Sequence, residues 1–185
     1  LVVPQNVYAT TYNNLIRALE RYQVIPINGA IKLTAGQNTI ENVQPGISRF
    51  SIGGDTRFTQ FVLGATISWS VIGEGVAGCG FTFADTSPQS YTLAYVDNSG
   101  GYGVSIREGD TFGTGIFGES IDTSATSYSV VIIVVDGKLD YYINNRHVGS
   151  MEYDPVAGTI SEAIVNFDAI DTDCTFDNIW LWSLD

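Results

Sequence analysis

The sequence after residue 28 is a succession of short segments rich in Val, Ile, Thr, Phe and Tyr, separated by clusters of Gly, Asp, Asn and Ser. This composition is typical of β-strands joined by turns. Asp136-Gly137 separates two such segments and predicts a two-residue hairpin, because both central positions of a type I′ turn need positive φ. Many short strands at near-regular spacing indicate an antiparallel sandwich or barrel. We predict strands at residues 30–33, 47–52, 59–71, 78–84, 91–96, 103–107, 128–135, 138–143, 147–151, 163–167 and 175–182.

Residues 1–27 differ from the remainder, and we predict that they form an N-terminal extension to a β-domain at residues 28–185. Four apolar residues of the extension follow the helical spacing i, i+3, i+4, i+7: Tyr12, Leu15, Ile16 and Leu19. Thr10 or Thr11 is the expected N-cap, and Pro26 stops the helix. One short amphipathic helix is therefore expected beside an otherwise all-β chain.

Two of the predicted strands are apolar on both faces. Residues 130–135 are all Val or Ile, and the closing strand ends in Ile179-Trp180-Leu181-Trp182. A strand of this kind is covered on both sides. The inner face of a sandwich supplies one cover, and the amphipathic helix of this chain or of a neighbouring chain supplies the other.

The charge balance excludes two classes of partner. Eight Lys and Arg residues stand against 20 Asp and Glu, for a net charge of -12. Such a surface attracts neither nucleic acid nor anionic membranes. The longest purely apolar run, residues 130–135, is far below the ~20 residues of a membrane helix, so no membrane insertion is expected. The chain begins at Leu1 without Met, from which we expect a processed, secreted protein.

Cys79 and Cys174 lie in strand-like segments far apart in the sequence. In a secreted protein an even number of cysteines favours a disulfide. Two buried free thiols are the other interpretation.

Three stretches resemble the concanavalin A-like lectin/glucanase superfamily in its laminin G-like branch: Gly78–Asp85 with Tyr91–Tyr95, Val130–Asn144, and Phe176–Trp182. The second departs from the family pattern, because Asn145 stands where the family has Gly. The resemblance runs from about residue 47 to the end of the sequence, and residues before Asn28 have no counterpart. It implies an antiparallel jelly-roll β-sandwich.

Catalytic members of that superfamily carry a Glu-x-Asp-x-x-Glu strand that supplies the nucleophile and the general acid. The closest acidic stretch here begins at Glu162 and has the wrong spacing. We therefore predict the non-catalytic branch, with a carboxylate pair from distant strands as the remaining route to a glycosidase. His147 is the only histidine, which leaves most Ser-His-Asp and multi-His zinc sites unavailable. We predict that it is a solvated residue at a hairpin tip.

The resemblance also implies a structural calcium ion, since carboxylates and carbonyls on loops suit a hard cation. Asp177 occupies the family's position at the start of the closing strand, with Glu41 or Asp55 as its expected partner. A second candidate is the acidic group Asp168, Asp171 and Asp173. The other interpretation of both groups is an acidic, solvated loop.

Aromatic residues make up 12% of the chain, which suits a glycan binder. Because side chains alternate along a strand, Ile179 and Leu181 share one face while Trp180 and Trp182 share the other. The candidate carbohydrate-binding residues are Trp180, Trp182 and Tyr142. Tyr91, Tyr95 and Tyr141 are possible extensions of the platform. Alternatively, these rings fill the core or lie beneath the N-terminal helix.

Two functions remain. The first is a self-assembling structural subunit of an extracellular filament, tubule or surface layer, with copies of itself as partners. Its contact residues are the apolar start Leu1, Val2 and Val3, which can add to a neighbour's sheet edge, together with Arg17 and Arg21. The second is a carbohydrate-binding, lectin-like module whose partner is a polysaccharide.

Overall fold

The structure is a computed structural model that describes residues 5–72, 74–113, 115–119 and 121–185. Within these ranges the chain forms one α-helix, α1 (Gln5–Arg21), followed by fourteen strands. The strands are β1 (Ala30–Ala35), β2 (Asn38–Asn42), β3 (Gly46–Ile52), β4 (Phe61–Val71), β5 (Ala77–Ser87), β6 (Ser90–Asp97), β7 (Gly101–Glu108), β8 (Thr111–Phe112), β9 (Ile116–Glu119), β10 (Tyr128–Val135), β11 (Lys138–Ile143), β12 (Arg146–Glu152), β13 (Thr159–Asn166) and β14 (Thr172–Ser183).

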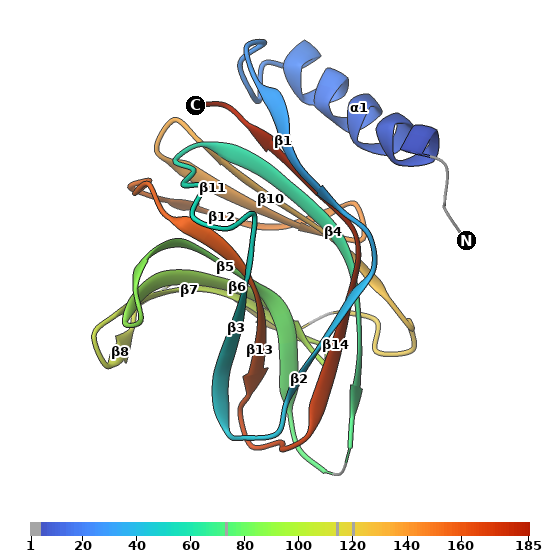
Figure 1. Cartoon of the computed structure of the whole chain (residues 1–185), viewed down its shortest axis with the longest axis vertical. Helices are drawn as coiled ribbons and strands as arrows, with labels where there is room; N and C mark the ends of the chain where they lie inside the picture. The colour runs from blue at the N-terminus through green and yellow to red at the C-terminus, as the bar shows by residue number, and fades with distance from the viewer. Residues whose placement is uncertain (1–4, 73, 114, 120) are drawn as a thin grey trace.

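The strands of the described residues form two seven-stranded antiparallel sheets that pack face to face (Figure 1). Sheet A has the order β1-β14-β4-β10-β11-β12, with β2 also paired to β14. Sheet B has the order β3-β13-β5-β6-β7-β8, with β9 also paired to β7. This is the jelly-roll β-sandwich with one helix that the sequence predicts. Within the described residues, no helix is both long enough and apolar enough to cross a membrane.

The main core lies between the two sheets and follows the alternation of each strand. Ile179 and Leu181 of β14, which were expected to share one face, point into it, and so do Ile132 of β10 and Phe81 of β5. The Asp136-Gly137 turn joins β10 to β11 with positive φ at both residues, as the hairpin prediction requires.

A second apolar layer lies on the outer face of sheet A, where α1 covers the sheet (Figure 1). Ile16 of α1 is buried against the outward-facing residues Ile133 of β10 and Trp180 of β14. The rings of Tyr12 and Trp180 lie 5.8 Å apart. The prediction that both faces of these strands are covered is confirmed, and the cover comes from the same chain.

The structure corrects several predicted boundaries. The helix begins at Gln5, so Thr10 and Thr11 lie inside it and are not its N-cap. Gln and Ala in the first turns favour helix, which outweighs the lower helix propensity of Thr. Strands β2, β8 and β9 were not predicted. Their sequences are polar, very short or rich in Gly, and therefore lack the β-type pattern.

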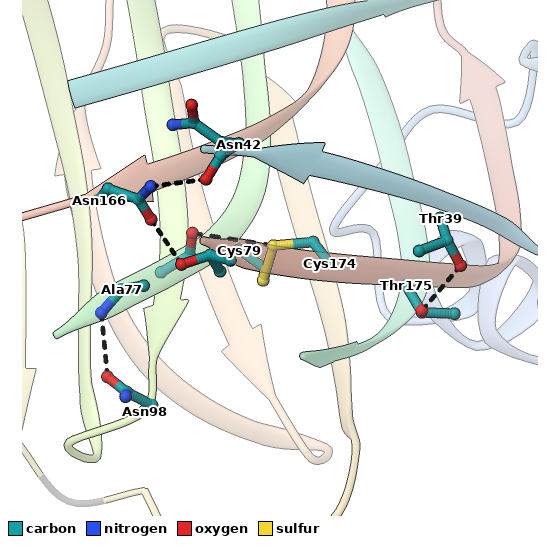
Figure 2. The surroundings of a disulfide bond; sticks show 10 residues. Thr39, Asn42, Ala77, Cys79, Asn98, Asn166, Cys174 and Thr175 are labelled. Atoms are coloured by element: carbon teal, nitrogen blue, oxygen red, sulfur yellow. Dashed lines mark hydrogen bonds between the residues drawn. A yellow bond between two sulfur atoms is a disulfide. The ribbon is translucent and has the colours of Figure 1, made fainter. Parts of the chain in front are cut away.

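The disulfide between Cys79 and Cys174 is confirmed, with the two Cα atoms 5.8 Å apart. It joins β5 of sheet B to β14 of sheet A and therefore crosses the core (Figure 2). A cross-link between residues separated by 95 positions removes roughly 4 to 5 kcal/mol of unfolded-chain entropy in the loop-closure model. Close by, Asn166 donates to the carbonyl of Asn42 at 2.9 Å, which ties sheet B to β2 of sheet A.

The packing of α1 makes a direct prediction. Ile16→Asp places an unpaired carboxylate in the buried layer, so we expect the free energy of unfolding to fall by about 3 kcal/mol. Tryptophan fluorescence should shift to longer wavelength as Trp180 becomes hydrated. Asn14→Asp adds the same charge at an exposed position of the same helix and is the matched control. Equal thermal unfolding curves for the two variants would contradict this packing.

Candidate functional site

The outer face of sheet B lies on the side of the molecule away from α1 (Figure 1). Aromatic side chains, including those of Tyr95 and Phe167, lie on this face. Along β6, Ala94 and Val96 point into the core, so Leu93 and Tyr95 point outward. Leu93 packs with residues of β13 into a small apolar cluster on this face, and Tyr95 packs against that cluster. Tyr95 was one of the predicted extensions of an aromatic platform.

A pocket of about 450 Å³ opens beside Tyr95. It lies where β6, β7 and β9 meet, next to the turn that joins β6 to β7. Its lining is aromatic and polar, and consists of Tyr95, Asp97, Ser99, Gly101, Tyr102, Phe117, Gly118 and Glu119. Pockets with aromatic walls and a few placed polar groups are typical ligand sites.

Glycine forms the floor between the rings. A Cβ atom at Gly103 of β7 would lie 2.8 Å from Cε1 of Tyr95 and 3.0 Å from Cδ1 of Phe117. Both rings therefore lie across a position that only glycine fits without displacing them. At Gly78 of β5, a Cβ atom would lie 3.0 Å from Cδ2 of Tyr95. The absence of side chains at these two positions lets Tyr95 lie low on the sheet.

Three rings line up across sheet B. Phe167, just after β13, lies 5.3 Å from Tyr95 between ring centres, and Phe117 of β9 and Tyr95 both lie over Gly103. Phe167 is 49% exposed and Phe117 is 59% exposed, so both rings are accessible to a ligand. We call Phe167, Tyr95 and Phe117 the aromatic row. It crosses the strands and ends at the pocket.

Asp97 is the most enclosed polar group of the pocket, with only 7% of its surface exposed. Its Oδ1 accepts hydrogen bonds from Ser99 N at 2.9 Å, Ser99 Oγ at 2.7 Å and Gly101 N at 2.8 Å. These bonds fix the turn between β6 and β7. Burial raises the pKa of Tyr95, and the nearby Asp97 carboxylate raises it further, so the phenol keeps its proton.

The other end of the same face carries two arginines, and both already have partners within the chain. The Arg49 guanidinium lies 4.3 Å from the centre of the Tyr91 ring, and Arg107 donates to the Tyr91 hydroxyl at 2.9 Å. Arg49 also pairs with Asp85. Tyr91 is consequently buried and does not extend the aromatic row. The structure therefore does not place it in an exposed platform, which was one of the predictions.

The predicted carbohydrate residues Trp180, Trp182 and Tyr142 lie on the outer face of sheet A. Trp180 is 9% exposed, and all three belong to the layer beneath or beside α1. Tyr142 also packs against the ring of His147, 4.9 Å away. The structure thus agrees with the alternative interpretation, in which the helix covers these rings, and does not present them as an exposed platform.

The predicted metal ligands are not brought together. Glu41 of β2 lies opposite Asp173 on β14, whereas Asp177 lies four residues farther along β14, opposite Thr66 of β4. Asp168 accepts a hydrogen bond from Val76 N. Across the described ranges no three His, Cys, Asp or Glu side chains converge as a metal site requires. Calcium binding stays a prediction.

The predicted subunit contacts lie at the start of the chain. Arg17 and Arg21 are exposed on α1. Leu1, Val2 and Val3 lie outside the described residues.

His147 is exposed and lies near the start of β12, just after the turn at Asn144-Asn145, as the predicted hairpin requires, and it also contacts Asp140 and Ser150. Its Nε2 atom lies 3.0 Å from Asp140 Oδ1 and 2.9 Å from Ser150 Oγ. In a Ser-His-Asp relay, the carboxylate and the hydroxyl meet opposite nitrogens of the ring. Here both meet the same nitrogen, so no relay can form.

Asp140 is the centre of this polar cluster. Burial raises its pKa, but hydrogen bonds from Ser150, Lys138 and His147 outweigh burial and leave the pKa below its ordinary value. The cluster therefore holds a carboxylate in its charged form at the edge of sheet A. We interpret the role of this polar cluster as structural.

Glu162, the start of the acidic stretch noted in the sequence, points into the sandwich. It is 1% exposed, and Asn38 Nδ2 donates to its Oε2 at 2.6 Å. Its Oε1 has no hydrogen-bond partner among the described residues. Burial raises the pKa of Glu162, and the bond from Asn38 offsets only part of that effect. Because it faces the core, Glu162 is not placed to act on a ligand at the surface.

Comparison with known proteins gives structural relatives only. No family model and no curated protein matches the sequence. Among solved structures, the carbohydrate-binding module CBM66 from Bacillus subtilis has a TM-score of 0.59 at 16% identity, over 82% of this chain and 92% of that one. A Bacillus licheniformis β-glucanase has a TM-score of 0.57 at 8% identity, over 83% of this chain and 81% of that one.

The chain has the concanavalin A-like jelly-roll fold. A fructosyltransferase from A. japonicus also matches, with a TM-score of 0.60 at 16% identity, over 90% of this chain but 28% of that one. The jelly roll is thus one part of that longer protein. At these identities the matches show the fold alone, and they include both a binding module and enzymes, so the non-catalytic prediction stays a prediction.

The buried carboxyl of Glu162 makes a pH-dependent prediction. Since its folded pKa is raised, the stability that its proton contributes is complete below the unfolded pKa, about 4.3, and is lost as the pH rises through the folded value. Glu162→Gln mimics the protonated form. We expect it to raise the midpoint of thermal unfolding at pH 7, by about 2 to 4 °C for each kcal/mol gained.

The gain should shrink as the pH falls toward the unfolded pKa. Glu152→Gln, at an exposed position of β12, is the matched control and should change little at either pH. A Glu162→Gln variant less stable than the parent at pH 7 would show that the charged form is favoured in the fold.

Proposed function

We propose that this chain binds a carbohydrate chain on the outer face of sheet B, along the aromatic row and in the pocket beside it. The observation that carries the proposal is the arrangement of Tyr95 and Phe117 over Gly103, next to the carboxylates of Asp97 and Glu119. Ring faces provide flat apolar surfaces for the C–H faces of sugar rings. Carboxylate oxygens accept hydrogen bonds from sugar hydroxyls.

The shape of the site supports a chain of sugars rather than a single small molecule. The aromatic row extends across several strands, because Phe167 follows β13 and Phe117 lies on β9 at the other end of the row. The pocket lies at only one end of the aromatic row. The similarity of the fold to a carbohydrate-binding module is in keeping with this function.

The cross-sheet disulfide supports an extracellular location for the protein, because structural disulfides persist in oxidising compartments. Polysaccharides are accessible to a protein in that location. The proposal is therefore a secreted carbohydrate-binding jelly roll.

Self-assembly, the other function predicted from the sequence, stays a prediction. One reason for it was the pair of doubly apolar strands, and α1 of the same chain already covers them. The exposed Arg17 and Arg21 remain its only candidate contacts within the described part of the chain.

The aromatic row is tested by substitution. Tyr95→Ala and Phe117→Ala should each weaken binding to an oligosaccharide found by screening a panel of polysaccharides by at least about tenfold, since truncating an anchor at the centre of an interface costs on the order of 1 to 2 kcal/mol or more. Isothermal titration calorimetry measures the change.

Phe112→Ala is the matched control, because Phe112 is an exposed phenylalanine at the far end of the same sheet, beside Tyr91. It should bind like the parent chain. Equal losses in all three variants, or failure of the folded parent chain to bind any member of a broad panel, would overturn the proposed function.

A further inference from the structure

The pocket beside Tyr95 is more acidic than binding to neutral sugars requires. Asp97 and Glu119 both line it, and none of the chain's eight Lys and Arg residues does. The two arginines on this face, Arg49 and Arg107, lie at its other end around Tyr91. The net charge of -12 adds to the negative potential.

The Asp97 carboxylate has only one of its two oxygens satisfied. Three donors from Ser99 and Gly101 bind Oδ1, whereas Oδ2 accepts no hydrogen bond from any described residue. Oδ2 is therefore free to accept a hydrogen bond from a positively charged ligand group, and hydrogen bonds between charged groups are the stronger kind. The side chain lines the pocket, so the pocket is where that partner can bind.

Glu119 completes the acidic wall. It pairs with Gly101 across β7 and β9, at the position next to the turn that Asp97 holds. Its side chain is exposed and forms no ion pair within the ranges that the structure describes. The two carboxylates therefore approach the pocket from β6 and from β9, on either side of β7.

The aromatic walls favour the same kind of ligand group. A cation within about 6 Å of a ring centre is attracted to the ring face. Tyr95 and Phe117 line the pocket together with the two carboxylates. An ammonium group entering here meets ring faces and negative charge at once, while a carboxylated or sulfated sugar is repelled.

We propose that the pocket selects a carbohydrate that carries a free, protonated amine, that is, an amino sugar without an N-acetyl group. The proposal rests on the proposed carbohydrate-binding function and specifies its substrate class. The aromatic row holds the sugar chain, and the ammonium group of one unit is bound between Asp97 Oδ2 and Glu119.

The test compares oligomers of equal length and linkage made of glucosamine, N-acetylglucosamine and glucose, by isothermal titration calorimetry with the full chain. At low salt the glucosamine oligomer should bind about tenfold more tightly than the other two. At about 0.5 M salt the advantage should fall to roughly twofold or less, because the charges are then screened over a few ångströms.

Two variants locate the effect. Asp97→Asn keeps an oxygen acceptor for the turn and removes the negative charge. Glu119→Gln removes the charge of an exposed side chain. Either should remove most of the preference for the glucosamine oligomer. Glu152→Gln removes an equal charge from sheet A and should leave the preference intact.

Each outcome bears on a different claim. Equal binding of the three oligomers overturns the amine specificity and leaves carbohydrate binding in place. Absence of binding to these oligomers and to a broad neutral panel overturns the proposed function itself. A short lysine peptide that binds as tightly as the glucosamine oligomer, with the same loss in Asp97→Asn, shows a cation site that does not recognise sugar and overturns the proposed substrate class.

Discussion

The architecture depends on the exclusion of water from both faces of sheet A. Strands β10 and β14 carry apolar side chains on both sides, so the sandwich core covers only half of their surface. Docking of α1 covers the other half through Ile16 and its neighbours. Burial of apolar surface contributes roughly 25 cal/mol per Å². The second apolar layer therefore stabilises the docking of the helix on the sheet.

That arrangement decides which face is free to bind a ligand. Trp180 is enclosed beneath α1, while no helix of the described residues covers the outer face of sheet B. On sheet B, glycine at positions 78 and 103 replaces the side chains that would otherwise lift Tyr95 off the sheet. The exposed rings of Phe117 and Phe167 then continue the surface on either side. The disulfide between β5 and β14 links the two sheets behind this site.

The fold could be predicted from the sequence because its signals are local. The Asp136-Gly137 hairpin, the alternation along β14 and the helical spacing of apolar residues each report directly on backbone structure. The family resemblance added the jelly-roll topology, and the structural matches confirm it. The disulfide between Cys79 and Cys174 was predicted from the even number of cysteines, their strand-like segments and the expected secretion.

The site could be predicted only in part. Tyr95 was among the candidate rings, but Phe117 lies on β9, a four-residue strand with a central Gly that gave no β-type signal. Asp97 and Glu119 are 22 positions apart in the sequence and meet only through the pairing of β6, β7 and β9. Conversely, Trp180 and Trp182 were candidates because alternation identifies the outward face of a strand but not what covers that face. An outward glycine beside an aromatic residue was the available signal for the proposed site.

The central claim is that ligand binds on the outer face of sheet B, and a nuclear magnetic resonance titration with a bound oligosaccharide tests it most directly. The account predicts that the amide signals of Gly101, Gly103 and Gly118 shift as ligand is added, while the indole signals of Trp180 and Trp182 stay in place. Shifts concentrated on the two indoles and on α1, with the three glycines unchanged, would contradict it.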